Sequence, residues 1–519
     1  IKIKNLIIEK NLIEEKIKNL DNKNWIANSD TIIFEPNFNE QLDSELISGY
    51  AKLIFSDYKL NKKLFEHYTN NNLNNLFFEG SKFNKDIPHF IHTLTHLTFG
   101  YYFNRDVLKL PYFLTHLTFG HYFNRDVIEL PCFLTHLTFG HYFNRDVSTL
   151  PQTLTHLTFN EKFNQDVSVL PKGITHLIFG HNFNRDVFVL PPTLTHLTFG
   201  KYFDQDVSAL PHSLTHLTFG SDFNQDVSNL PPSITHLTFG YEFNQDVSNL
   251  PPFLTHLTFG CKFNMDVSEL PQNLTQLTFG SCFNQDVSNL PPTLTYLTFG
   301  YEFNRNVLKL PSTLTHLTFG TRFNQDVSKL PQILTHLTFG NNFNQDVSKL
   351  PQSLTHLIFG DYFNQDVSKL PPTLTHLTFG NNFNQNTSKL PYSITHLTLG
   401  SEFKQECDIP PNIKYLELNC NNQYIIDSLP NSVIELKLNM EFNLQMDNLP
   451  SSIKKIMIHP YGSYDKDLNC LPDFVEELKL NMSYSKRILC IPSNLKKIVC
   501  MQNHPYADDF VMCEVEAIY

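Results

Sequence analysis

Charge is the first thing that this sequence has little of. Charged residues make up 17% of its 519 residues, below the about 25% of an average globular chain. The formal net charge is −12, so the basic excess that nucleic-acid-binding proteins carry is absent. No apolar run approaches the about 20 residues of a membrane span, and no signal peptide opens the chain. The sequence therefore predicts neither nucleic acid nor membrane as a partner.

Signatures of catalysis are missing as well. The sequence contains no nucleophile elbow, phosphate-binding loop or metalloprotease helix, so we expect no enzyme and no cofactor. Its nine cysteines include no CxxC pair and show no metal-ligand spacing. Unpaired thiols favour a reducing, intracellular compartment. The nine are Cys132, Cys261, Cys282, Cys407, Cys420, Cys470, Cys490, Cys500 and Cys513.

Phenylalanine is abundant by contrast, with 46 copies beside a single Trp, because a 20-residue unit recurs. Sixteen consecutive copies run without insertion or deletion from Leu94 to about Phe403. We number the positions of each copy from its first apolar residue, which is Leu94 in the first copy. A solenoid is one body at any length, so the repeat decides the architecture and the usual domain size does not.

One copy, residues 214–233, shows the pattern of the unit. From His216 to Phe219 polar and apolar side chains alternate, which predicts a short, half-buried strand. Gly220 ends the strand where the backbone needs freedom, and Pro231 starts the next coil. Ten residues separate these two, which leaves room for at most a turn of 3-10 helix. The side chains expected to point inward are Leu214, Leu217, Phe219, Phe223, Val227 and Leu230.

Weaker copies flank the regular block. Strand-like runs at 31–34, 53–55 and 76–78 precede it, and five Leu-Pro or Ile-Pro elements follow it. One coil cannot bury its apolar side chains alone, so we expect the coils to stack with their strands about 4.8 Å apart in a parallel sheet. The expected segments are an N-terminal cap (1–30), degenerate repeats (31–92), regular repeats (93–403), divergent repeats (404–500) and a C-terminal cap or tail (501–519).

The consensus of the unit resembles that of the FNIP repeat family. It reads Phe-Asn-Gln-x-Val, followed by Leu-Pro-x-Ser-Leu-Thr-His-Leu-Thr-Phe-Gly. This family is similar to leucine-rich repeats and is found in social amoebae and large amoeba-infecting viruses, although Asn224 lies later than the Asn of a leucine-rich repeat. The resemblance covers residues 31–500. It implies a β-rich solenoid with a leucine-rich-repeat-like parallel β-sheet, about 24 coils of 20 residues and little helix.

Many viral members of this family carry an F-box before the repeats, which implies recruitment of substrates to a ubiquitin ligase. About 30 residues precede the first repeat-like segment here, too few for an F-box, so we do not carry that function over. The chain begins at Ile1 without an initiator Met. An F-box upstream, with the host ubiquitin machinery as partner, therefore stays an open alternative. Otherwise the family implies binding only in general terms.

Position three of the repeat forms a row of histidines. Alternation places this row on the exposed face of the sheet, which suggests a metal-binding surface or a pH switch. A metal site needs converging ligands, however, and a straight row offers two at best. We favour repeat inheritance, in which neutral imidazoles stack and exchange hydrogen bonds with flanking Thr. The row comprises His96, His116, His136, His156, His176, His196, His216, His236, His256, His316, His336, His356, His376 and His396, interrupted by Gln276 and Tyr296.

Two further rows, Asp at position thirteen and Asn at position eleven, invite similar readings. Closely spaced carboxylates suggest calcium or paired-acid catalysis, but glycine-rich calcium loops are absent and identical copies offer no two distinct environments. We favour turn formation, in which Asp bonds turn amides. We expect the Asn row to be a buried or half-buried ladder that satisfies backbone groups, with Asp204 as a tolerated substitution.

Positions eight and nine vary most, and they lie just beyond the strand. Variation within a strict frame is where specificity for a partner could reside, although neutral drift at a solvated edge explains it equally well. Tyr, Arg and His are enriched in interface hot spots. Arg at position twelve adds a positive band toward the N-terminal half, and Gln replaces it later. The expected partner-binding residues are Tyr102, Tyr122, Tyr142, Arg105, Arg125, Arg145, His116 and His136.

We therefore expect a non-enzymatic scaffold for protein–protein interaction whose partner lies along the exposed strand face. One alternative is the substrate-recognition part of a ubiquitin ligase, if an F-box lies upstream. The other is a structural rod or virion component, in which uniformity itself is useful. The sequence does not predict the oligomeric state.

Overall fold

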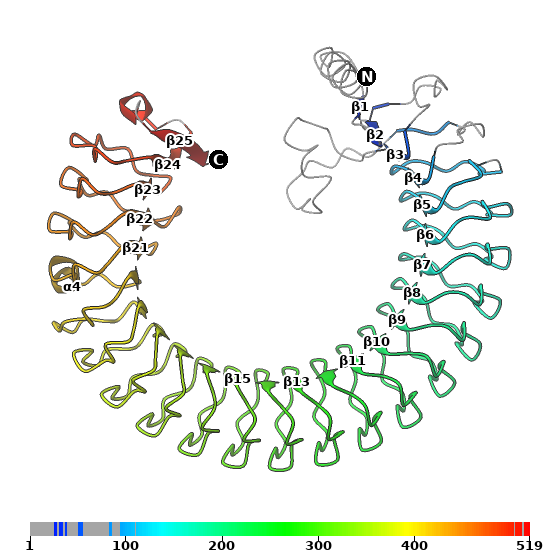
Figure 1. Ribbon diagram of the computed structural model, residues 1–519, viewed down its shortest axis with the longest axis horizontal. Helices are drawn as coiled ribbons and strands as arrows, with labels where there is room; N and C mark the ends of the chain where they lie inside the picture. Colours follow the sequence, from blue (N-terminus) through cyan, green and yellow to red (C-terminus); the bar gives the residue numbers. More distant parts are fainter. Residues whose placement is uncertain are drawn as a thin grey trace, which may run out of the picture. The chain divides into compact units, whose positions relative to one another are not determined.

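The structure is a computed structural model that describes residues 25–27, 31–34, 37–38, 50–55, 82–85, 94–108, 110–502, 504–510 and 513–518. The chain divides into two compact units, residues 1–254 and 255–519. Within each unit the strands lie side by side in one row, and the turns that join them form the opposite side (Figure 1). The expected N-terminal cap lies outside the described residues, except for 25–27.

Unit 1 contains ten parallel strands among its described residues. Each regular strand pairs with the next in a register of 20 residues, such as His216 with His236. One antiparallel strand, β1 (Trp25–Ala27), pairs with β2. The parallel strands are β2 (Thr31–Phe34), β3 (Lys52–Phe55), β4 (His96–Thr98), β5 (His116–Thr118), β6 (His136–Thr138), β7 (His156–Thr158), β8 (His176–Ile178), β9 (His196–Thr198), β10 (His216–Thr218) and β11 (His236–Thr238).

Among its described residues, unit 2 contains fourteen parallel strands with the same type of coil. The predicted leucine-rich-repeat-like parallel solenoid is confirmed, with about 22 turns of about 20 residues where about 24 coils were expected. The strands are β12 (His256–Thr258), β13 (Gln276–Thr278), β14 (Tyr296–Thr298), β15 (His316–Thr318), β16 (His336–Thr338), β17 (His356–Ile358), β18 (His376–Thr378), β19 (His396–Leu399), β20 (Tyr415–Leu418), β21 (Glu435–Leu438), β22 (Lys455–Ile458), β23 (Glu477–Lys479), β24 (Lys497–Met501) and β25 (Glu514–Ile518).

The core of each coil is the predicted inward set. Leu214, Leu217, Phe219, Phe223, Val227 and Leu230 are all buried. Phe219 stacks on Phe223 of its own coil, with ring centroids 3.7 Å apart. Phe223 in turn lies 6.1 Å from Phe203 of the preceding coil. Two continuous columns of rings therefore run along the inside of the unit, which explains the abundance of Phe and the need for stacked neighbours.

The glycine at position seven is required for a different reason than expected. A Cβ atom at Gly220 would overlap the carbonyl group of Gly200 in the preceding coil. Close approach of two backbones, and not a left-handed conformation, therefore selects glycine here. Asn160 is an exception, and its Nδ2 donates to the carbonyl oxygen of Phe139 at 2.6 Å.

The upstream coils contain an insertion that the sequence pattern concealed. Strand β3 pairs directly with β4, in the register Lys52 with His96. Phe83 stacks on Phe55 at 3.9 Å, as Phe103 stacks on Phe99 at 3.6 Å. Phe83 therefore completes the coil that begins with β3. Residues 76–78, which we expected to form a strand, lie outside the described residues.

The divergent repeats keep the coil but change its column of rings. Tyr464 and Tyr484 continue the column after Phe442, at 6.0 and 6.1 Å. Burial raises the pKa of both phenols, to about 12 for Tyr484.

Six described strands follow β19, one more than the five expected, because β25 pairs in parallel with β24. The described residues hold one α-helix, α4 (Gln423–Asp427), and one 3-10 helix, η2 (Ala507–Phe510). In the described part of the chain, we find no helix with the length and hydrophobicity of a membrane span.

Candidate functional site

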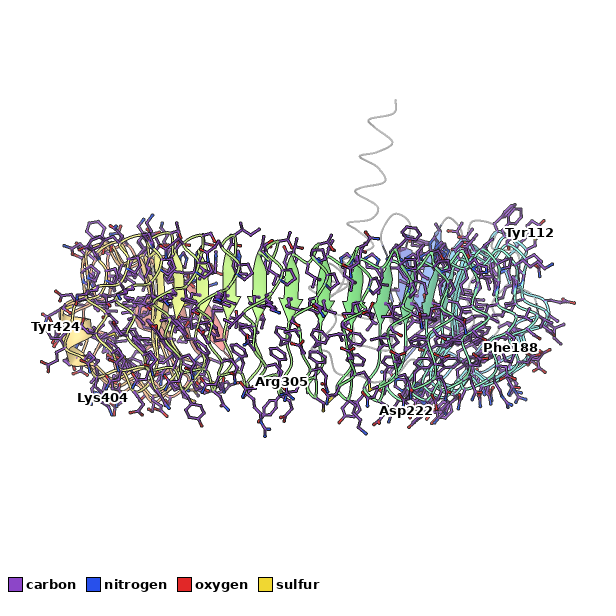
Figure 2. The ribbon with its side chains drawn as sticks, turned by 90° about the horizontal axis from the view of Figure 1, so that it is seen from below. Tyr112, Phe188, Asp222, Arg305, Lys404 and Tyr424 are labelled. Carbon is purple, nitrogen blue, oxygen red and sulfur yellow. The ribbon has the colours of Figure 1, made fainter. Side chains whose placement is uncertain are left out.

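Each regular coil presents three surfaces to solvent besides its back. The sheet face carries positions three and five, the glycine-side rim carries positions seven to twelve, and the proline-side rim carries positions eighteen to twenty. In unit 1, Asp222 at position nine and Tyr112 at position nineteen lie at opposite edges of the molecule (Figure 2). The variable side chains of a coil are thus divided between two separate rims.

The histidines of the sheet face form a stacked column. His116 stacks on His96 and on His136, with centroid distances of 4.1 Å and nearly parallel rings. Tyr296 keeps the stacking and lies 4.2 Å from His316. The histidine rings are half-buried between their neighbours, whereas Tyr296 is exposed. The row is therefore less exposed than simple alternation predicted, while the predicted stacking is present.

A threonine hydroxyl fixes each of these rings. Thr115 Oγ1 lies 3.1 Å from the carbonyl oxygen of Thr95 and 2.9 Å from Nδ1 of His116. A hydroxyl has one hydrogen, so both contacts are hydrogen bonds only if Nδ1 carries a proton and donates it to Oγ1. The remaining nitrogen, Nε2, then gains or loses the titrating proton.

Desolvation and neighbouring histidines lower the pKa of this column. Burial is the larger cause for His116 and His136, and the positive charge of nearby His residues adds to it. Lys52 contributes a further lowering at His116. Stacked rings hold their nitrogens in parallel, so ligands do not converge on one point. Among the described residues, no group of three or more His, Cys, Asp or Glu side chains is placed to hold a metal ion.

The Asp row builds turns, as predicted. Asp226 accepts the backbone N–H of Ser228 at 2.9 Å through Oδ1 and the Ser228 hydroxyl at 2.7 Å through Oδ2. These bonds lower the pKa of the Asp226 carboxyl, because they favour its charged form. Where Ser stands at position fifteen, the carboxylate is therefore engaged with the turn that follows it. Leu108, Ile128 and Phe188 replace that Ser in three copies that keep the Asp.

The Asn row forms the predicted ladder along the glycine-side rim. Asn104 Oδ1 accepts the backbone N–H of Asn124 at 3.1 Å, and the bond recurs from coil to coil. Asp204 preserves it, since its Oδ1 accepts the N–H of Asn224 at 2.9 Å. The members of the ladder are half-buried or exposed. The ladder therefore joins successive turns on the outside of the coil.

Arginine at position twelve belongs to the same ladder. Arg125 Nε donates to the carbonyl oxygen of Asn104 at 3.2 Å, and Arg145 Nε donates to that of Asn124 at 3.2 Å. Gln245 Nε2 makes the equivalent bond to Asn224 at 3.0 Å. Arg and Gln at position twelve therefore form the same bond to the preceding coil, and Arg adds an exposed positive charge.

The tyrosines at position nine, three residues before these arginines in the sequence, stack on one another. Tyr122 stacks between Tyr102 at 5.6 Å and Tyr142 at 5.1 Å, and all three side chains are exposed. His121 stacks on His141 at 4.4 Å and meets the ring of Tyr122 edge-on. We call the surface made by Tyr102, Tyr122, Tyr142, Arg105, Arg125 and Arg145 the tyrosine–arginine rim. His116 and His136, the other expected partner-binding residues, lie on the sheet face in β5 and β6.

A second aromatic cluster, which the sequence analysis missed, lies on the proline-side rim of the same coils. Tyr112 meets Phe113 and Phe133 edge-on at 5.2 and 5.3 Å, and all three are exposed. Position twenty is usually Ser or Thr, whose hydroxyl bonds the preceding coil, as Ser213 Oγ bonds the Leu194 carbonyl oxygen at 2.7 Å. Phe113 and Phe133 have no hydroxyl to form that bond, and their rings are exposed. This departure from the consensus was the available signal.

Comparison with known proteins identifies the repeat. A family model described as FNIP Repeat matches residues 123–162, 163–202, 186–222, 223–262, 264–302, 303–342, 323–362, 346–382, 383–421, 406–439 and 421–460. No curated protein matches the chain.

Solved structures confirm the resemblance to leucine-rich repeats. CroV588 of the giant virus CroV, described as a novel circular LRR protein structure, is 30% identical with a TM-score of 0.70. The match covers 96% of this chain and 100% of that one. The Toll–Spätzle complex of Drosophila shares the fold at 12% identity and a TM-score of 0.51, with 96% of this chain and 89% of that chain covered.

Proposed function

This chain belongs to the FNIP repeat family, and we propose that it is a non-enzymatic scaffold that binds a partner protein along its strand face and the adjoining tyrosine–arginine rim. Leucine-rich-repeat-like solenoids typically offer extended surfaces to protein partners. A family of this kind normally carries out no catalysis. The proposal concerns where on the solenoid the partner binds.

One observation carries the proposal. Exposed aromatic side chains gather on the coils that begin at Leu94, Leu114 and Leu134, on the glycine-side rim of all three and on the proline-side rim of the first two. Tyr102 and Tyr112 of the first of these coils are 46% and 55% exposed. Single exposed aromatic side chains are normal on a protein surface, but a cluster of neighbouring ones is typical of an interface. Elsewhere in the regular block most position-nine residues are polar, as at Asp222 and Glu242.

Binding also accords with the way in which the rims are held. The Asn ladder and the ring columns fix the backbone of every coil in the same manner. Partner-facing side chains can then vary without disturbing the fold, and a rigid rim loses little entropy on association. All nine cysteines are free thiols. They support a reducing intracellular compartment, the host cytoplasm if the source is viral.

A pull-down with the full chain as bait tests the proposal. We expect a specific protein that is retained by the wild-type chain and lost when Tyr102, Tyr122 and Tyr142 are all replaced by Ala. Tyr362 occupies the same position as an exposed residue in unit 2, so Tyr362→Ala is the matched control and should retain the partner. Recovery of no specific protein by the wild-type chain would favour the structural rod.

A further inference from the structure

We infer that the tyrosine–arginine rim binds an extended peptide segment whose acidic side chains stand at alternate positions. The inference rests on the proposed function and names the chemistry of the partner at that site. The segment would run along the solenoid, across the coils of β4, β5 and β6, and place one carboxylate at each arginine.

The distance between neighbouring coils is close to the side-chain repeat of an extended peptide. Beneath the rim, the buried rings of Phe103 and Phe123 at position ten are 6.2 Å apart, and those of Phe123 and Phe143 are 6.1 Å apart. The arginines follow two residues later on the same turns. In an extended peptide, side chains on one face recur about every 6.4–6.8 Å, because each residue advances about 3.2–3.4 Å. One coil of the rim therefore matches two residues of the segment.

A backbone hydrogen bond holds the guanidinium group of each arginine in place. Arg105 Nε donates to the carbonyl oxygen of Asn84 at 2.7 Å, and Arg125 and Arg145 repeat this bond one coil further each time. The bond leaves the terminal nitrogens of each guanidinium to donate to another group. No ion pair joins these three arginines to a carboxylate within the described part of the chain, and all three are exposed. A fixed guanidinium binds carboxylate in a two-pronged manner at low entropic cost.

The charge around the rim limits the site to these coils. Asp146, the carboxylate next to Arg145, bonds the N–H of Ser148 at 3.1 Å. Asp106 and Asp126, next to Arg105 and Arg125, are exposed and have no Ser two residues later. Glu161 ends the stretch, since its carboxylate lies 3.1 Å from Nδ1 of His141. Further along unit 1, position nine is acidic at Asp222 and Glu242 and would repel an acidic segment. Three consecutive coils with Arg at position twelve occur only at the N-terminal end of the regular block.

The tyrosines favour a peptide over a single-stranded nucleic acid. Single strands bind by stacking their bases on exposed aromatic faces. Here both faces of the central Tyr122 are covered, because it lies nearly parallel to Tyr102 and Tyr142, at 10° and 4°. The row offers ring edges and hydroxyl groups instead, which suit backbone and side-chain groups of a peptide.

Fluorescence anisotropy on the full chain tests the inference. The probe is a labelled peptide Ser-Glu-Ser-Glu-Ser-Glu-Ser, and its matched control is Ser-Ser-Glu-Glu-Glu-Ser-Ser, which has the same composition and charge. We expect the alternating peptide to bind more tightly. Replacing Arg105, Arg125 and Arg145 together by Gln should weaken its binding about tenfold, because three exposed ion pairs are lost. Gln keeps the bond to the Asn carbonyl, as Gln245 does, so the fold should persist.

The control variant is Arg305→Gln. Arg305 makes the same backbone bond to Asn284 at 2.8 Å but stands alone in unit 2, so its loss should leave binding unchanged. Equal affinity for the two peptides, an unchanged affinity in the triple arginine variant, or tighter binding of an oligouridylate would each overturn the inference. If the alternating peptide fails while a protein partner still depends on Tyr102, Tyr122 and Tyr142, the scaffold function stands and only its acidic ligand is refuted.

Discussion

Thr115 and His116 are neighbours in the chain, and their side chains form a relay in which His116 Nδ1 donates to the Thr115 hydroxyl. The same hydroxyl donates to the carbonyl oxygen of Thr95 in the preceding coil. The relay ties the orientation of each imidazole to the backbone of the coil below it. It also leaves Nε2 as the nitrogen whose protonation changes the charge of the column.

Stability should therefore fall in mild acid. The folded-state pKa of His116, His136 and His156 lies below the usual 6.5, through burial first and through neighbouring His second. Below about pH 6.5 the unfolded chain binds more protons than the folded one, so the free energy of unfolding decreases as pH falls. Above that pH the term vanishes. We expect a Tm lower at pH 5 than at pH 7.5, measured by circular dichroism.

A histidine variant separates this effect from other acid effects. Gln occupies the same position naturally at Gln276, so replacing His116, His136 and His156 by Gln should reduce the pH dependence. The Asp carboxyls with a lowered pKa, such as Asp226, act only below their usual 3.8 and do not overlap this window. An unchanged Tm between the two pH values would refute the role of the column.

The Asn ladder makes a local prediction. Asn324 Oδ1 accepts the N–H of Asn344 at 2.9 Å and the Nε2 of Gln345 at 3.0 Å. Asn324→Ala removes this acceptor, and an unsatisfied, partly buried donor costs about 1–3 kcal/mol. Hydrogen exchange at Asn344 should accelerate accordingly. Asn324→Asp is the control, because Asp204 shows that a carboxylate accepts the same bond; equal exchange in both variants would contradict the ladder.

The ring columns predict a large loss of stability on truncation. Phe323 is fully buried and lies 3.7 Å from Phe319 and 6.1 Å from Phe343. Phe323→Ala should reduce the free energy of unfolding by about 3–5 kcal/mol through lost burial and a cavity. Phe253 is 61% exposed, so Phe253→Ala should change it little. Urea titration followed by circular dichroism measures both, and similar losses would show that the columns do not carry the core.

The tyrosine row should matter for binding and not for folding. Replacing Tyr102, Tyr122 and Tyr142 by Ala removes exposed rings and leaves the buried columns and the Asn ladder in place. We expect the Kd for the protein partner to rise at least tenfold, as for a cluster of hot-spot residues. The Tm should stay within about 2 °C, because surface changes away from structural bonds are nearly neutral. Isothermal titration and a thermal melt measure the two quantities separately.

Much of the fold followed from the repeat because identical coils constrain one another. Alternation at His216–Phe219 predicted which side chains point inward, and the described strands repeat that pattern from coil to coil. Upstream of the regular block, the sequence pattern did not show that Phe83 belongs to the same coil as β3. The paired residues Lys52 and His96 are not separated by the regular 20 residues, and the pattern alone does not distinguish an insertion from an additional coil. The ring contact between Phe55 and Phe83 resolved it.

The candidate site was only partly accessible from sequence. Periodicity placed Tyr102, Tyr122 and Tyr142 in one row, because position nine repeats every 20 residues. It could not reveal that Arg125 Nε bonds the Asn104 carbonyl oxygen, since that depends on the turn between them. The cluster of Tyr112, Phe113 and Phe133 was overlooked because variation was considered only at positions eight, nine and twelve. The contact between Tyr112 and Phe133 of the next coil depends on how the coils stack, which the sequence does not show directly.

Hydroxyl-radical footprinting of the full chain with its protein partner measures the accessibility of individual tyrosines. If the N-terminal coils bind the partner, Tyr102, Tyr122 and Tyr142 will be protected on complex formation. Tyr362 and Tyr392, which are 56% and 70% exposed in unit 2, will react as in the unbound chain. Protection of Tyr362 or Tyr392 without any at the three rim tyrosines would contradict the central claim that partner binding resides where the repeats depart from their consensus at the tyrosine–arginine rim.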